Sequence, residues 1–309
     1  MPFYYSTSIQ RVHKLLFLLT LSALLFSCNR EDDPPQLTPS TPSTPTPTQV
    51  TQTFNYNGLG RQYTLFTPTD LPPNAPLVFM LHGYQGRAVE YIPWVGLNTV
   101  AQTHGFAVCY PQGSNDTGGT PHWNSRLTIS QTDDIGFLTA LAEHLQQTQD
   151  LDPNRTFSCG FSNGGFMSYT MACERPGIFR AIGSVTGTMS GYTWRNRDST
   201  TQPTPILQIS GINDNVVPIN GSMSTFGGWG GAPHMDSIMN YWANFNQTQT
   251  SDTSLIGPNA TGIHYQDGVN DHEVWYYKIK NFGHEWPQTN NNAGFSAAEL
   301  LWDFFSQFE

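Results

Sequence analysis

The sequence predicts an α/β fold in which a mostly parallel central sheet carries helices on both faces, and two observations support this. Short apolar runs, such as Leu77–Leu81 and Ile206–Ser210, have the composition of strands that are buried on both faces. These runs alternate with segments of helical spacing, such as 133–147, in which apolar residues recur at three- and four-residue intervals. Strands that alternate with helices usually pair in parallel, because each crossover returns the chain to the same end of the sheet.

The expected elements follow in order from residue 53 to residue 308. Thr53–Thr67 alternates around Asn57-Gly58, which favours an antiparallel hairpin at the start of the sheet. Asp133 and Asp134 begin one expected helix, where carboxylates are favoured. The strands expected after the hairpin are 77–81, 106–110, 155–161, 181–185, 206–210 and 273–279. The expected helices are 95–104, 133–147, 165–173, 237–246 and 296–308.

The five residues Gly160-Phe161-Ser162-Asn163-Gly164 have the form G-x-S-x-G and lie between an expected strand and an expected helix. A serine at such a sharp turn projects its hydroxyl beyond the sheet, and small neighbours let the backbone turn without a Cβ clash. The pattern alone also fits a plain tight turn with an exposed serine. Its position between strand and helix favours the nucleophile elbow of a serine hydrolase, with Ser162 as the nucleophile.

A serine hydroxyl needs a base to take its proton, and that base is normally a histidine oriented by a carboxylate. Asp214 follows strand 206–210, at the strand end where catalytic groups gather in open α/β sheets. His284 follows strand 273–279 at the same edge, so the chain order is serine, acid, base. The rival residues lie in irregular stretches, in a glycine-rich insertion or at the opposite edge: Asp198, Asp236, Asp252, His234, His264 and His272.

The tetrahedral intermediate of acyl transfer needs backbone N–H donors for its oxyanion. One expected donor is the N–H of Asn163, directly after the nucleophile. The other is the N–H of Tyr84, in the loop that follows strand 77–81. His82 lies in the same loop and is expected to brace it rather than to take part in the chemistry.

A series of motifs carries a family resemblance: Leu81-His82-Gly83, Trp123-Asn124, Asp133 to Leu138, Gly160 to Gly165, Gly211 to Pro218 and Gly283 to Pro287. In order and spacing they resemble the poly(3-hydroxybutyrate) depolymerase and feruloyl/acetylxylan esterase group of α/β hydrolases, related to carbohydrate esterase family 1. The resemblance implies an α/β-hydrolase fold with Ser162 as nucleophile, Asp214 as orienting acid and His284 as base. The chain departs from the family at Ser210-Gly211, where His-Gly is usual, and lacks the family's cysteine near the tryptophan-asparagine motif.

The first 27 residues have the pattern of a bacterial lipoprotein signal peptide, in which a basic region precedes an apolar run too short to span a bilayer. Cys28 follows a small residue, as in a lipobox, and is the expected lipidation site; an ordinary secretory signal is the alternative. Residues 28–50 are acidic and then rich in Pro and Thr, so they are expected to form an extended tether. Residues 51–309 then form one catalytic domain, held at the outer membrane on its surface or periplasmic face.

The charge and the cysteine content of the sequence limit the kinds of partner and cofactor that are expected. The formal net charge is −10 and no basic patch is visible, so nucleic acid is not an expected partner. Cys109, Cys159 and Cys173 are expected as buried thiols, since cysteine in apolar strand patterns behaves as a small hydrophobe. No Cys and His spacing typical of a metal site is present, and neither a metal nor another cofactor is expected. The domain is expected to be a monomer.

Aromatic residues on the loops of the catalytic edge are the expected substrate-binding residues: Trp123, Trp229 and Trp286, with Tyr84 nearby. Segment 226–231 is glycine-rich and is expected to act as a lid. Aromatic faces suit a phenolic acyl group, a sugar ring or a polyester segment alike. The predicted function is therefore a serine carboxylic ester hydrolase acting on feruloyl or acetyl esters of plant polysaccharide or on hydroxyalkanoate esters. The alternatives are a catalytically silent glycan-binding surface lipoprotein, and a thioesterase or peptidase on the same fold.

Overall fold

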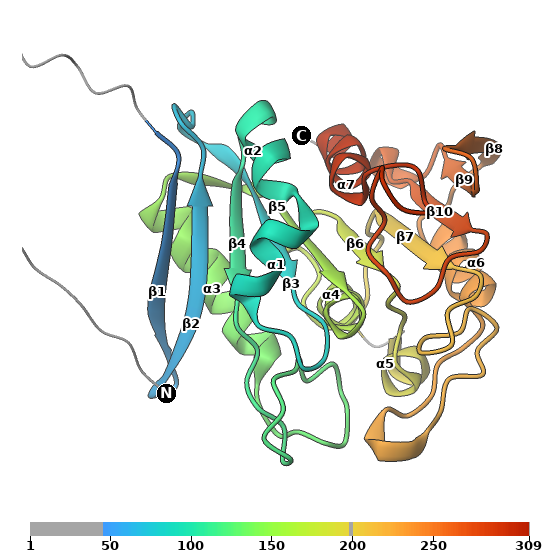
Figure 1. Ribbon diagram of the computed structural model, residues 1–309, viewed down its shortest axis with the longest axis horizontal. Coiled ribbons are helices and arrows are strands. Elements are labelled where there is room, and N and C mark those ends of the chain that lie inside the picture. The colour runs from blue at the N-terminus through green and yellow to red at the C-terminus, as the bar shows by residue number, and fades with distance from the viewer. Residues whose placement is uncertain (1–45, 198–199, 309) are drawn as a thin grey trace, which may run out of the picture. The chain divides into compact units, whose positions relative to one another are not determined.

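A ten-stranded sheet runs through the molecule in the order β1-β2-β4-β3-β5-β6-β7-β10-β9-β8 (Figure 1). The computed structural model describes residues 46–197 and 200–308. Its strands are β1 Thr48–Tyr56, β2 Leu59–Thr67, β3 Ala75–Leu81, β4 Ala107–Pro111, β5 Leu151–Phe161, β6 Ile182–Val185, β7 Ile206–Gly211, β8 Thr250–Ile256, β9 Ala260–Gln266 and β10 Val274–Ile279. Its helices are α1 Ala88–Val95, α2 Leu97–His104, α3 Asp134–Thr148, α4 Asn163–Glu174, α5 Gly191–Asn196, α6 Met235–Phe245 and α7 Ala297–Phe305.

The strands from β4 to β10 in this order pair in parallel, and an antiparallel hairpin continues the sheet at each side. This confirms the predicted α/β class with a mostly parallel sheet. The first hairpin turns at Asn57-Gly58, as predicted. The second hairpin, β8 and β9, was not predicted. Asp252 lies in β8 rather than in an irregular stretch, and His264 lies in β9 rather than beside a turn.

The predicted helix 95–104 is α2, which begins two residues later at Leu97, and the helix before it, α1, was not predicted. Gly96 ends α1 and begins α2 with a left-handed φ of 79°, a conformation that glycine adopts without steric cost. The six-residue helix α5 is a further element that was not predicted. Gly96 turns the chain two residues after Trp94, which matters for the candidate site below.

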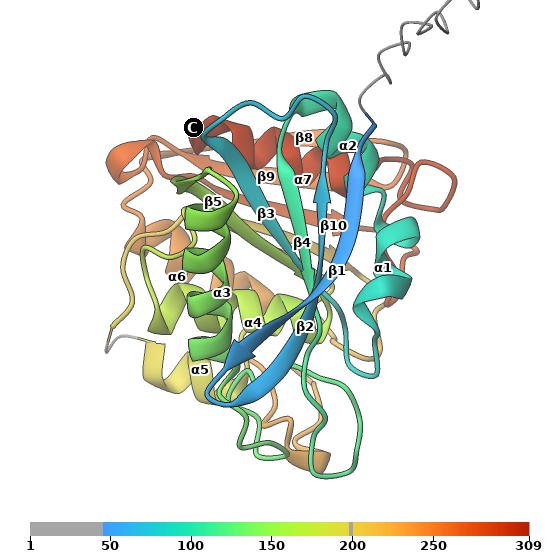
Figure 2. The same ribbon diagram turned by 90° about the vertical axis from the view of Figure 1, so that its left-hand side faces the viewer.

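Two apolar layers, one on each face of the sheet, hold the helices. Alternate residues of β3 divide between them: Val78 and Met80 pack with α1, α2 and α7, whereas Leu77 and Phe79 pack with α3, α4 and α6. In Figure 1, α1 and α2 stand in front of the sheet and α3 lies behind it, and Figure 2 shows the same layers from the side. This is the arrangement expected where parallel strands are buried on both faces.

The described part of the chain belongs to one compact unit, Thr44–Glu309. The signal peptide, Cys28 and most of the tether predicted for residues 28–50 lie outside the described residues. The first strand begins at Thr48, so residues 48–50 pair with β2 and belong to the sheet. Cys109, Cys159 and Cys173 are buried thiols, as predicted. Within residues 46–197 and 200–308, no helix has the length and apolar character that crossing a bilayer requires.

Candidate active site

The carboxyl ends of the parallel strands form one edge of the sheet, at the bottom of Figure 1, where the loops 112–133 and 212–234 extend from it. The two loops meet at a hydrogen bond of 3.2 Å from the Thr128 N–H to the Gly228 carbonyl oxygen. Ser162, Asp214 and His284 all lie on connections at this edge, after β5, β7 and β10.

Ser162 lies at a strained turn between β5 and α4. Its φ of 52° and ψ of −118° fall in a region that residues with a Cβ rarely occupy. The turn closes because Gly160 and Gly164 pack directly on each other, and a Cβ on Gly160 would lie only 2.2 Å from the Gly164 carbonyl carbon. This is the geometry of a nucleophile elbow, in which the serine hydroxyl stands beyond the sheet.

Asp214 and His284 are joined by a hydrogen bond of 2.7 Å between Asp214 Oδ2 and His284 Nδ1. The other carboxylate oxygen, Oδ1, accepts the N–H groups of Val216 and Val217, each at 2.8 Å. Because the carboxylate takes the hydrogen of Nδ1, the Nε2 atom of a neutral His284 is left as an acceptor. The Asp214 side chain is almost completely buried, whereas 17% of the His284 side chain is exposed.

The sheet register brings these groups to Ser162. Phe161, Val185, Ile209 and Tyr277 lie opposite one another across β5, β6, β7 and β10. The Phe161 ring, next to the serine, lies 5.0 Å from the His284 ring between centroids. Among the described residues no hydrogen bond joins Ser162 Oγ to His284, and in ligand-free enzymes this contact is often long until substrate binds.

The loop after β3 passes directly over the serine. A Cβ on Gly83 would lie 3.4 Å from the Ser162 Cβ and 2.9 Å from the Tyr91 hydroxyl, so only glycine fits there comfortably. Neither the N–H of Tyr84 nor that of Asn163 donates a hydrogen bond within the described chain. Two free N–H groups beside the serine are what an oxyanion requires.

His82 braces this loop, as the sequence suggested. Its Nε2 accepts the Gly113 N–H at 2.9 Å and contacts Gln112 Nε2 at 3.0 Å, while Nδ1 donates to the Gly83 carbonyl oxygen at 2.7 Å. Burial is the main reason that the pKa of His82 falls from 6.5 to about 4. Electrostatic interactions with His122 and Arg61 lower it further. The ring is therefore neutral at physiological pH and carries its hydrogen on Nδ1.

Asn163 connects the elbow to the long loop 112–133. Its side-chain oxygen accepts the Trp123 N–H at 2.7 Å, and its Nδ2 donates to the Trp123 carbonyl oxygen at 3.0 Å. The next residue, Asn124, donates its N–H to Asp134, whose carboxylate pairs with Arg61 at 2.6 Å. A buried polar chain thus runs from β2 to the residue that follows the candidate nucleophile.

Trp123 and Trp286 are buried, whereas the sequence led us to expect them exposed on the rim. Trp123 is completely buried and donates its indole N–H to the His82 carbonyl oxygen at 3.0 Å. Trp286 is 2% exposed and donates to the Val95 carbonyl oxygen at 3.2 Å. Both side chains support loops, because each indole N–H finds a buried backbone acceptor.

Trp229 is half-buried at the catalytic edge. Its ring lies 5.1 Å from Tyr84 and 5.8 Å from Phe166, in edge-to-face contacts. The Tyr84 hydroxyl donates to Asp116 Oδ2 at 2.8 Å, which holds this group of rings to the loop 112–133. Trp229 and Tyr84 therefore form a side of the site next to the candidate oxyanion donor.

Trp94 is an aromatic residue of this edge that sequence reasoning missed. Its side chain is 37% exposed at the end of α1, and its ring contacts Phe161 edge-to-face at 5.1 Å. The signal was an isolated tryptophan in a segment not assigned to a helix. Only the fold shows that α1 lies beside the elbow.

The rival histidines have other partners. His234 caps α6 by accepting the Asp236 N–H at 3.1 Å, and it is exposed. His264 stacks on Trp275 at 4.1 Å and contacts the Tyr277 hydroxyl at 2.6 Å. His272 accepts a hydrogen bond from Arg180 at 3.1 Å, at the amino end of β10.

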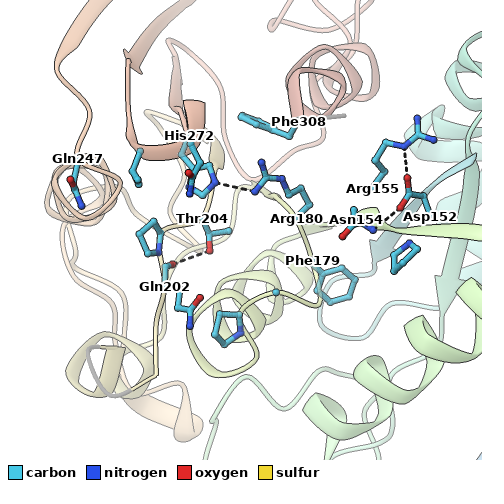
Figure 3. A pocket seen from close by; sticks show the side chains of 16 residues that line it. Asp152, Asn154, Arg155, Phe179, Arg180, Gln202, Thr204, Gln247, His272 and Phe308 are labelled. Carbon is cyan, nitrogen blue, oxygen red and sulfur yellow. Dashed lines mark hydrogen bonds and ion pairs between the residues drawn. The ribbon is translucent and has the colours of Figure 1, made fainter.

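A cavity of about 660 Å³ is remote from these residues (Figure 3). Asp152, Arg180, Thr204 and His272 line it, and each lies at or before the amino end of a parallel strand. The cavity therefore opens at the edge opposite to the elbow, and its size alone does not connect it with the chemistry. Residues 46–197 and 200–308 contain no group of three or more His, Cys, Asp or Glu side chains arranged to hold a metal ion.

A strained serine elbow after β5, with a histidine and carboxylate pair at the same edge of a parallel sheet, defines the class of the α/β hydrolases. The solved structure of an acetyl xylan esterase from Aspergillus awamori shares this fold, with a TM-score of 0.62 and 17% identity, covering 85% of this chain and 100% of that one. The family model for the esterase PHB depolymerases matches residues 62–223, and the chain belongs to that family.

Two curated relatives carry the name of a single kind of esterase. A probable feruloyl esterase C of Aspergillus niger is 34% identical over 172 residues, which are 53% of this chain and 58% of that protein. Feruloyl esterase C of Emericella nidulans is 33% identical over 185 residues, or 57% of this chain and 63% of that protein. The match thus spans about three fifths of these relatives' own length.

Proposed function

We propose that the protein is a serine carboxylic ester hydrolase that works through an acyl-enzyme. The observation that carries the proposal is the pairing of Asp214 and His284 at the same sheet edge as the strained Ser162. Membership of an esterase family and the names of the relatives support the same reaction type.

In the proposed first step, Nε2 of His284 takes the Ser162 proton while Oγ attacks the ester carbonyl carbon. The N–H groups of Asn163 and Tyr84 stabilise the resulting oxyanion. The imidazolium then gives its proton to the leaving alcohol, and an acyl-serine remains. Water attacks this ester by the same route in reverse, which releases the acid and restores Ser162.

The first experiment tests the nucleophile. A fluorophosphonate probe is expected to label wild-type protein once, at Ser162, and Ser162→Ala is expected to lose both labelling and turnover of a short p-nitrophenyl ester. The fold of the variant is checked by its thermal unfolding. Folded wild-type protein that stays unlabelled would favour the second candidate, a catalytically silent glycan-binding protein.

For the substrate class, we propose feruloyl or acetyl esters of plant polysaccharide, because the relatives are named for feruloyl and acetyl xylan esters. The family name also points to hydroxyalkanoate esters. Comparing methyl ferulate, acetylated xylan and 3-hydroxybutyrate oligomers orders these substrates. A panel that includes thioesters and amides distinguishes a thioesterase or a peptidase.

We also propose that a lipid on Cys28 holds a monomeric enzyme at the outer membrane. The proposal rests on the sequence of residues 1–50, with its apolar run, lipobox-like cysteine and Pro/Thr-rich stretch. In cell fractionation, Cys28→Ser is expected to move the protein from the membrane fraction to the soluble fraction. An unchanged membrane fraction would argue against the lipid anchor.

A further inference from the structure

A small cavity of about 250 Å³ lies between the end of α1 and the loop that follows the candidate base. Its lining includes Trp94, Trp286, Pro287, Gln288, Thr289 and Asn290. The volume is below the range of roughly 300–1,000 Å³ that is typical of drug-sized ligands. The cavity therefore has room for a single ring rather than for an extended ligand.

One wall of the cavity is an accessible but fixed indole. The Trp94 ring contacts both Tyr91 and Phe161 edge-to-face, each at 5.1 Å between centroids, and 37% of the side chain is exposed. A ring held on two sides loses little further freedom when a ligand stacks on it. Such a pre-organised aromatic surface suits the apolar face of another ring.

The other wall is polar. Gln288 donates its Nε2 to the Trp94 carbonyl oxygen at 2.9 Å, which fixes the loop to the end of α1. Thr289 and Asn290 are exposed, and neither side chain hydrogen-bonds within the described chain. A hydroxyl and an amide are thus available to a ligand that carries several hydroxyl groups, which a phenolic ring does not.

The position of this cavity relative to His284 determines which part of a bound ester it faces. His284 must protonate the leaving alcohol, so the alcohol lies on the His284 side of the ester. Phe161 connects that side with the cavity, because its ring lies 5.0 Å from His284 and 5.1 Å from Trp94. Tyr84 and Trp229 lie together beside the candidate oxyanion donor instead.

We infer that the cavity is a subsite for one sugar ring of the leaving alcohol, with Trp94 as its stacking surface and Asn290 as a hydroxyl-binding group. The inference rests on the proposed ester hydrolysis. It makes the carbohydrate part of the substrate, rather than the acyl group alone, a source of specificity.

The test compares two esters that share one acyl group, methyl ferulate and a feruloylated arabinoxylan oligosaccharide. Trp94→Ala is expected to lower the ratio of kcat/KM, sugar ester to methyl ester, by about tenfold, which corresponds to roughly 1.4 kcal/mol. Asn290→Ala, a milder change on the exposed loop, is expected to lower the ratio about threefold, and Trp94→Phe to retain much of it. Val89→Ala is the control, because Val89 is exposed on the same helix and lies outside the cavity lining.

A binding measurement separates this inference from the proposed function. Calorimetric titration of Ser162→Ala protein with the unesterified oligosaccharide is expected to show binding that weakens about tenfold when Trp94→Ala is added. If no ester is turned over but this binding is found, the proposed function fails, and the cavity is a sugar-binding site without a leaving alcohol. If both esters lose activity equally, or if binding does not depend on Trp94, the subsite is wrong.

Discussion

At the scale of single residues, Asp214 hydrogen-bonds both to the backbone of its own turn and to the candidate base His284. Its Oδ1 holds the turn 214–217 through two N–H groups, and its Oδ2 meets the Nδ1 of His284. An asparagine keeps an oxygen that can accept the N–H groups of the turn, but its NH₂ group then faces the imidazole. An NH₂ donor requires Nδ1 to be an acceptor, so the hydrogen of the ring moves to Nε2. The two functions of Asp214 are therefore separable by mutation.

We predict that Asp214→Asn lowers kcat on a short ester by about 10³- to 10⁴-fold, because Nε2 would carry the hydrogen and could no longer accept the serine proton. Thermal unfolding is expected to shift by only a few degrees, since the turn keeps its acceptor. Steady-state kinetics and a melting curve check the two halves. Loss of activity below tenfold would exclude Asp214 as the orienting acid.

Individual side chains are also where the sequence was least informative. Trp123 and Trp94 are both tryptophans near the catalytic edge, yet the first is completely buried and the second is 37% exposed. What separates them is a set of contacts over long sequence separations, such as the bond from Trp123 to the His82 carbonyl oxygen. A local sequence pattern does not contain such long-range contacts, whereas the tight turn at Ser162 could be predicted from its immediate neighbours.

At the scale of elements, the buried pair of Arg61 and Asp134 joins β2 to α3. Asp134 also accepts the Asn124 N–H at 2.7 Å, so the pair fixes the start of the chain of contacts that leads to Asn163. Burial raises the pKa of Asp134, although the Arg61 guanidinium and the hydrogen bonds oppose that change. The carboxylate thus depends on its partner to remain charged in an apolar layer.

Removing that partner is expected to be costly. Arg61→Ala would leave a buried carboxylate without its cation and is predicted to lower the free energy of unfolding by about 3–5 kcal/mol. The matched control is Arg126→Ala, which removes a pair with Glu174 in which the arginine is 42% exposed. The control should cost less than about 1 kcal/mol. Equal urea unfolding midpoints for the two variants would contradict this assignment.

Most of the elements were predictable, and the strand β8 shows why some were not. Strands such as β3 and β7 are continuous apolar runs because both faces are covered, and that pattern is visible in the sequence. The strand β8 is Thr, Ser and Asp over most of its length and is exposed at the edge of the sheet. With no buried face, it has no alternating pattern, so only its pairing with β9 reveals it.

At the scale of the whole molecule, two buried histidines make the stability of the fold depend on pH. Burial is the main reason that the pKa of His82 and that of His272 fall from 6.5 to about 4. Between these values the unfolded chain binds protons that the folded protein does not. The fold is therefore most stable above pH 6.5, and stability decreases as the pH falls toward 4.

We predict a loss of about 2 kcal/mol for each of these histidines between pH 7.5 and pH 5, measured by urea unfolding. Carboxylates whose pKa is lowered by the fold act at a lower pH. Asp152, for example, keeps a lowered pKa through Arg155 and backbone N–H groups in spite of burial, and its ordinary value is already 3.8. His82→Gln keeps a side chain of similar polarity without the titration, so it should flatten the profile. A profile that does not change would remove His82 as a cause.

The unusual backbone conformation of Ser162 has a consequence for the thermal stability of the protein. A residue that occupies φ 52° and ψ −118° does so only because the surrounding turn forces it. Glycine adopts that conformation without steric strain because it has no Cβ. Ser162→Gly should therefore be inactive and yet have a higher melting temperature than Ser162→Ala. Thermal stability and turnover would then favour different residues at position 162, and selection for stability alone would be expected to replace the candidate nucleophile.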